Sequence, residues 1–197
     1  DKAFFNYMSS QFIFGLGNLM LTAPLVVVLA DQFSFNYLGE ILIVSTIPII
    51  LMPLSIPLWS RMLNRMHVIQ FRAVHSWVFV LSALIFGASI YFGNTYGLWI
   101  AAGIRGIGFG GGVLAWNLGH QDFAPVEQSS RYMGLHVTLT GIRGLLAPAL
   151  GMGLYTTLHG VGETTGGSVF FVGAAISSIG GIGFLLLSRT SPDKSST

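Results

Sequence analysis

Long apolar stretches alternate with short polar turns along the whole chain. A helix that spans a bilayer needs about 20 mostly apolar residues. Six segments meet this requirement, and they cover residues 4–30, 37–60, 70–92, 97–118, 131–158 and 167–188. Because none of them shows the period-two alternation of a membrane β-barrel, the spanning segments must be helices. The pattern predicts an all-α integral membrane protein, a bundle of six transmembrane helices.

The composition agrees with this fold class and excludes several functions. Only 8% of the residues are charged and 52% are hydrophobic, with a mean hydropathy of +0.72, whereas a soluble domain has about 25% charged residues. The chain has no cysteine, which excludes disulfides and thiolate metal sites. Its nine Lys and Arg are too few and too dispersed for nucleic acid. We expect a lipid bilayer around the chain, with no nucleic-acid partner, cofactor or metal.

The distribution of basic residues predicts the orientation in the membrane. Lys and Arg in short loops concentrate on the cytoplasmic side. Seven of the nine fall on one side of the predicted bundle: Lys2, Arg61, Arg65, Arg72, Arg131, Arg189 and Lys194. The turns on the other side contain no Lys or Arg, and Asp31, Glu40 and Glu163 lie in or beside them. We therefore expect a multi-pass protein of the cell membrane with both termini in the cytoplasm.

The remaining two basic residues, Arg105 and Arg143, fall inside predicted spans. A guanidinium at the centre of a spanning helix costs about 2.5–3.5 kcal/mol on insertion scales, and it usually faces a cavity or a partner. Arg143 shares a helix face with His136 and Thr140, which predicts a polar stripe pointing away from lipid. No Asp or Glu lies within a predicted membrane core to neutralise either arginine.

Two more stripes of polar or aromatic residues share single helix faces. Arg105 lies on one face with Phe109, Gly112 and Trp116, where an aromatic ring can stack on the cation. The first predicted helix has a similar stripe of neutral polar residues, which are Gln11, Asn18 and Thr22. Each feature has a structural alternative, since buried arginines also bind backbone carbonyls and neutral polar residues also join neighbouring helices.

Histidines offer fewer candidates. Only His136 is expected to face a cavity. We expect the other four near the membrane interfaces, and these are His67, His75, His120 and His159.

Glycines and prolines predict how the helices pack and bend. Residues 103–112 contain six glycines, and small residues let membrane helices approach closely. Two further faces suggest the same role: Gly141, Gly144, Pro148 and Gly151 in the fifth span, and Gly173, Ser177 and Gly181 in the sixth. The second span has three prolines, Pro48, Pro53 and Pro57, and is expected to bend.

Short internal similarities suggest a duplicated three-helix unit, a common feature of transporters. The segment FGLGN (14–18) matches RGIGF (105–109), and ILMPLSIPLW (50–59) matches LLAPALGMGLY (145–155). Matches this short also arise by chance in glycine-rich sequence. An odd number of helices per unit inverts the second copy, and the charge distribution agrees with this. We therefore expect one domain, 1–197, of two inverted three-helix repeats at about 1–95 and 96–197.

Three motifs resemble the major facilitator superfamily of transporters. The loop SRMLNRMHVIQFR (60–72) is similar to the family's loop between the second and third helices, although Asn64 stands where the family has an aspartate. IRGIGFGGG (104–112) and GLLAPALGMG (144–153) resemble its fourth- and fifth-helix patterns. The resemblance implies a gating loop that includes Arg61, Asn64 and Arg65. Because the loop motif is degenerate and a polar tail follows, we interpret the chain as the C-terminal six-helix half.

The resemblance implies a secondary active transporter that moves a small anionic or polar solute by alternating access. The substrate-binding candidates are Arg105, Arg143, Gln11, Asn18, Trp116, His136 and Thr140. The chain begins at Asp1 without a methionine, so we expect it to be part of a longer protein. Its expected partner is the missing N-terminal six-helix half or a second copy. Two alternatives remain: an intramembrane enzyme, for which we see no nucleophile and base facing one cavity, and a non-transporting membrane scaffold. We do not expect an enzyme.

Overall fold

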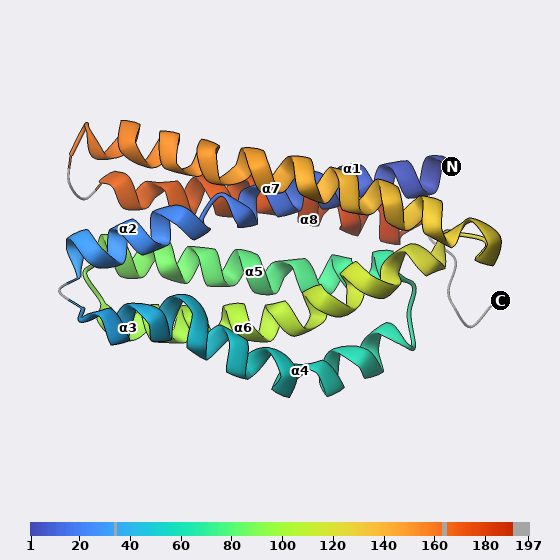
Figure 1. Cartoon of the computed structure of the whole chain (residues 1–197), viewed down its shortest axis with the longest axis horizontal. Helices are drawn as coiled ribbons and strands as arrows, with labels where there is room; N and C mark the ends of the chain where they lie inside the picture. Colours follow the sequence, from blue (N-terminus) through green and yellow to red (C-terminus); the bar gives the residue numbers. More distant parts are fainter. Residues whose placement is uncertain (34, 163–164, 191–197) are drawn as a thin grey trace.

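A computed structural model of the chain describes residues 1–33, 35–162 and 165–190. Its regular structure over these ranges is entirely helical. The main helices are α1 (Lys2–Leu19), α2 (Thr22–Gln32), α3 (Tyr37–Ile41), α4 (Ile47–Leu63), α5 (Val68–Tyr91), α6 (Thr95–Leu118), α7 (Ser129–His159) and α8 (Val169–Ser188). Figure 1 shows them running along the length of an elongated bundle. Glu163 and Lys194, which contribute to the predicted orientation, lie outside the described residues.

Six helical segments in the described part are long and apolar enough to cross a membrane. They are Lys2–Gln32, Tyr37–Leu63, Val68–Tyr91, Thr95–Asp122, Val126–His159 and Gly166–Ser188. Each one overlaps a span expected from the hydrophobic pattern. The prediction of an all-α bundle with six helical segments long and apolar enough to span a membrane is thereby confirmed.

The first span is interrupted between α1 and α2. Pro24 has no N–H, so the carbonyl of Met20 loses the hydrogen bond that a continuous helix would give it. Gly151 of α7 packs directly against this carbonyl, and a Cβ at that position would overlap it. The interruption is therefore covered by a neighbouring helix, as irregular backbone inside a membrane must be.

The second span is also irregular. A π-helical turn, Leu42–Thr46, joins α3 to α4, and Pro53 and Pro57 lie inside α4. Figure 1 shows α3 and α4 following a curved path, as the three prolines of this span predict.

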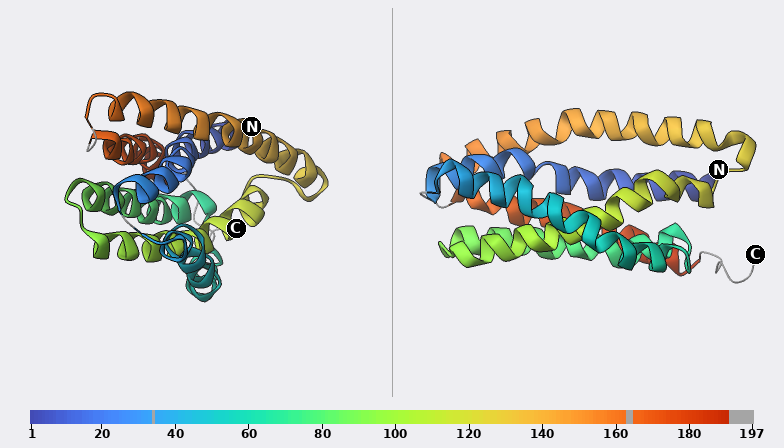
Figure 2. Two further views of the ribbon diagram at one scale, coloured as in Figure 1. Left: turned by 60° about the vertical axis from the view of Figure 1, so that its left-hand side comes forward. Right: turned by 60° about the horizontal axis from the view of Figure 1, so that its bottom comes forward.

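The helices associate as two sets that meet through α5 and α8. Helix α1 packs on α7 and α8, α6 packs on α4 and α5, and α5 packs on α8. Figure 2 gives two further views of this arrangement. Glycines allow the closest approaches: Gly17 lies against the backbone of Gly173, and Gly106 lies against the backbone of Pro48.

The glycine face predicted on α7 does not pack as expected. Gly151 is in close contact, but Gly141 and Gly144 are exposed, and a Cβ at either position would meet nothing within 4 Å. The packing interpretation is wrong for these two residues. The physical reason is that α7 is largely exposed, with only 17% of its most apolar stretch buried, so a neighbouring backbone lies against Gly151 but not against Gly141 or Gly144.

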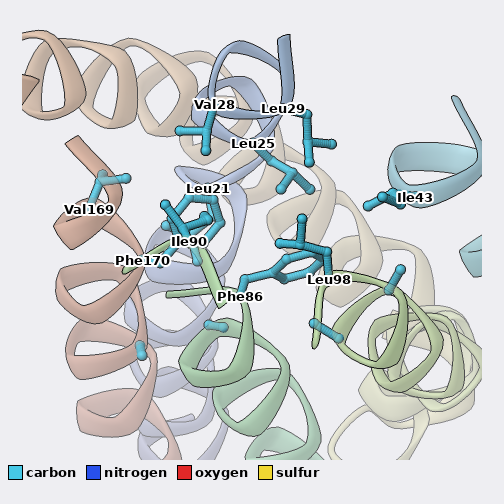
Figure 3. Packing of buried hydrophobic residues seen from close by; sticks show 14 of the residues in the cluster. Leu21, Leu25, Val28, Leu29, Ile43, Phe86, Ile90, Leu98, Val169 and Phe170 are labelled. Carbon is cyan, nitrogen blue, oxygen red and sulfur yellow. The ribbon is translucent and has the colours of Figure 1, made fainter. Parts of the chain in front are cut away.

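Two apolar clusters hold opposite ends of the bundle together. The first lies around α2 and the adjoining ends of α5, α6 and α8, and Figure 3 shows its residues, among them Leu25, Phe86 and Phe170. The second surrounds the start of α1 and the end of α8, where Tyr7 and Phe184 are fully buried.

Candidate functional site

A cavity of about 330 Å³ lies between the two apolar clusters. Helices α1, α4, α5, α6 and α7 all contribute to its wall. Its polar lining residues are Gln11, Asn18, Arg72, Asn117 and Arg143. Val113 and Asn117 are exposed, so the cavity reaches the surface of the bundle along α6.

Arg143 reaches this cavity from α7 and is only 6% exposed. Its Nη1 donates a hydrogen bond to the backbone carbonyl of Gln11, at 2.8 Å. The approach depends on Gly15, because a Cβ there would overlap the guanidinium. The contact matches the structural alternative of an arginine bound to a carbonyl, yet the same guanidinium also lines the cavity, and its Nε has no described partner.

Arg72 is a cavity residue that sequence reasoning missed. We expected it among the basic loop residues, but it lies in the second turn of α5, is 2% exposed and lines the cavity. Placing it in a loop is wrong because α5 already begins at Val68. A signal was available, since Arg72, His75 and Phe79 recur at helical spacing on one inward face.

His75 holds Arg72 in place. Its Nε2 lies 2.7 Å from the backbone carbonyl of Gly108, which can only accept, so Nε2 carries the proton. Its Nδ1 is then free to accept from Arg72 Nη1, at 3.3 Å. His75 is fully buried between α5 and α6, and the expectation that it lies near a membrane interface stays a prediction. Gly111 leaves room for the imidazole, which a Cβ would overlap.

Arg105 lies next to the cavity rather than in it. Its Nη2 donates to Thr22 Oγ1 at 3.0 Å, and its guanidinium carbon is 5.4 Å from the centre of the Phe109 ring. The predicted stacking of an aromatic ring on Arg105 is thus confirmed. Together with Asn18, Arg105 lines a much smaller neighbouring space, beside the interruption between α1 and α2.

The other candidates from α6 and α7 form one group. Trp116 lines the cavity, and its Nε1 donates to Thr140 Oγ1 at 3.5 Å. The His136 ring lies 5.6 Å from the Trp116 ring and is fully buried, without a described hydrogen-bond partner. His136 and Thr140 therefore contact the Trp116 side chain but do not line the cavity themselves.

The residues of the proposed gating loop lie elsewhere. Arg61, Asn64 and Arg65 are exposed at the end of α4 and in the turn that follows. None of them lines the cavity, and their gating role stays a prediction.

The cavity has an excess of positive charge. Arg72 and Arg143 both line it, and no Asp or Glu is among its described lining residues. Their hydrogen-bond partners, the His75 ring and the Gln11 carbonyl, are neutral. Buried atoms of the same site also lack described partners: the Nε of Arg72, the Nε of Arg143 and the Oε1 of Gln11. Because buried polar groups are normally satisfied, these three atoms are unusual, although each is itself buried away from the open space of the cavity.

Comparison with known proteins adds no assignment. The chain matches no family model, and no curated protein or solved structure is significantly similar to it. Within the described ranges, no three His, Asp or Glu side chains gather as a metal site would require. The cavity and the helices around it are therefore the features that indicate a function.

Proposed function

We propose that the chain is half of a secondary active transporter of the major facilitator type, and that it moves a small polar solute without covalent chemistry. The observation that carries this proposal is the arginine-lined cavity inside helices long enough to cross a membrane. Ionisable groups inside membrane-spanning helices cost free energy, and where they occur they usually mark substrate or ion pathways.

The packing of the helices supports an internal repeat. If the spans containing α1, α4 and α5 correspond to those containing α6, α7 and α8, the main helix contacts have counterparts. The pair α1 and α8 corresponds to α6 and α5, the pair α1 and α7 corresponds to α6 and α4, and α5 with α8 joins the two sets. Inverted repeats at about 1–95 and 96–197 have this pairing, and substrate sites lie where such repeats meet.

The interrupted first span supports the same proposal. Discontinuous helices often form the binding sites of transporters, because their ends expose backbone groups near the bilayer midplane. Here Met20 and Leu21 separate α1 from α2. Thr22, which follows them, binds Arg105 and lies one helical turn beyond the cavity residue Asn18.

A partner bundle completes the proposed transporter. A charged cavity that opens at Val113 and Asn117 toward hydrocarbon would be costly, so protein or water must cover it. Two spans, Tyr37–Leu63 and Val126–His159, are the least buried: only 17% of the most apolar stretch of each is buried, against 44–61% in the other four. Both of them contribute to the cavity wall. We assign the cover to the N-terminal six-helix half or to a second copy, in the cell membrane, with both termini in the cytoplasm.

Labelling of an introduced thiol tests alternating access without knowledge of the substrate. The chain has no cysteine, so Asn18→Cys supplies its only thiol, and position 18 lines the cavity near the middle of the first span, Lys2–Gln32. We expect it to react with an impermeant maleimide both in intact cells and in inside-out vesicles. The control Thr190→Cys, exposed after α8, is expected to react in vesicles only. Reaction of Asn18→Cys from one side only would favour a non-transporting scaffold.

A further inference from the structure

We infer that the cavity binds the oxoanion group of a small solute, a carboxylate or a phosphate, between Arg72 and Arg143. This inference deepens the proposed transport function and depends on it only for what the binding serves. It also changes the pair of residues involved, since the sequence alone grouped Arg143 with Arg105.

The charges of the cavity favour an anion. Arg72 of α5 and Arg143 of α7 both line the cavity, so their like charges face the same space and repel each other. Since no described lining residue is acidic, nothing in the wall offsets this repulsion. Electrostatic interactions are strengthened in a low-dielectric interior, so an anion between the two guanidiniums gains more there than at an exposed site. A neutral solute would leave the repulsion in place, and a cation would increase it.

The hydrogen-bonding capacity favours an oxoanion in particular. A guanidinium has five N–H donors in a planar fork that matches carboxylate and phosphate oxygens. Arg72 and Arg143 each donate one hydrogen bond from Nη1 to the protein, and both side chains line the cavity, so other N–H groups of each fork are left for a ligand. A carboxylate or phosphate has enough acceptor oxygens to bind donors from two arginines, whereas a halide is a single acceptor atom.

Both guanidiniums are held in position before any ligand arrives. His75 links Arg72 to the backbone of α6, and the absence of a Cβ at Gly15 lets Arg143 rest against α1. Preorganisation of this kind lowers the entropy that binding must overcome. Arg105 is engaged differently, since its hydrogen bond goes to Thr22 and it lines only the neighbouring space.

The size and walls of the cavity limit the rest of the solute. A volume of about 330 Å³ is at the lower end of the range for small-molecule sites. The rings of Phe14, Phe79 and Trp116 provide the apolar part of the cavity wall. The site fits a short organic acid or a small phosphate ester.

Thermal unfolding of the purified protein in detergent tests this inference without a transport assay. We expect inorganic phosphate, acetate or both to raise the melting temperature saturably at constant ionic strength, while chloride and glycerol do not. Comparison of phosphate with acetate shows which oxoanion the site prefers. Arg72→Gln and Arg143→Gln are each expected to weaken the apparent Kd roughly tenfold or more, or ~1.4 kcal/mol. The control Arg189→Gln removes an exposed guanidinium at the end of α8 and should leave the Kd unchanged.

Three results would overturn the inference: no saturable effect of either oxoanion, equal loss in the Arg189→Gln control, or an unchanged Kd in both cavity variants. If a glutamine variant does not fold, Arg72→Lys keeps the charge but not the fork, and it should still bind less tightly. Failure of the inference is separable from failure of the transport proposal. Oxoanion binding with one-sided labelling of Asn18→Cys contradicts transport alone, and two-sided labelling without oxoanion binding contradicts the oxoanion site alone.

Discussion

The contact between α1 and Arg143 makes Gly15→Ala a sensitive test of the site. A methyl group at position 15 would overlap the Arg143 guanidinium, which is the flexible end of a side chain. The arginine should therefore move while the helices keep their places. The move breaks the 2.8 Å hydrogen bond from Arg143 Nη1 to the Gln11 carbonyl and takes the guanidinium out of its position in the cavity.

The expected change in stability is the difference of two opposing contributions. A hydrogen bond to a charged group contributes about 1.5–3 kcal/mol. Alanine in place of glycine inside a helix raises the free energy of unfolding by ~1 kcal/mol. We therefore expect Gly15→Ala to lower the free energy of unfolding by about 0.5–2 kcal/mol. Gly144→Ala is the matched control on α7, where a Cβ meets nothing within 4 Å, and it should raise stability by up to ~1 kcal/mol.

Two measurements on the same preparations check this prediction. SDS titration in mixed micelles gives the free energy of unfolding, and the oxoanion titration gives the apparent Kd. Gly15→Ala should be less stable than the wild type and bind phosphate or acetate more weakly, while Gly144→Ala keeps the wild-type Kd. The reasoning about Gly15 is refuted if both variants gain stability to the same extent and both keep the wild-type Kd.

Two other predictions use the same contacts and the same topology. Gly151→Ala should cost about 1–3 kcal/mol, because its Cβ meets a backbone carbonyl that cannot move alone, while Gly153→Ala has open space and should not destabilise; equal SDS titration curves would contradict this. Asn64→Cys and Phe92→Cys, exposed at opposite ends of the bundle, should react with an impermeant maleimide from the cytoplasm and from outside respectively; labelling from one common side would exclude the predicted topology.

The sequence by itself determined the six spans and the inward faces of two helices. In lipid, each spanning segment must satisfy its own backbone hydrogen bonds, so local apolar length is sufficient to define a helix. Helical periodicity then placed Gln11 and Asn18 on one face of α1, and Arg143 on one face of α7 with Thr140. The structure has Gln11, Asn18 and Arg143 at the same cavity.

Only the tertiary structure decided which of these faces meet. Periodicity places residues around one helix axis but does not determine which neighbouring helix each face contacts. Arg72 joined the site because α5 begins early enough to bury it, and its partner His75 is fixed by a carbonyl of another helix. The glycines show the same limit, since Gly151 and Gly144 lie on one helix but only Gly151 has a neighbouring backbone against it. Contacts of this kind depend on how helices pack and rotate relative to one another, and no local pattern in the sequence specifies that.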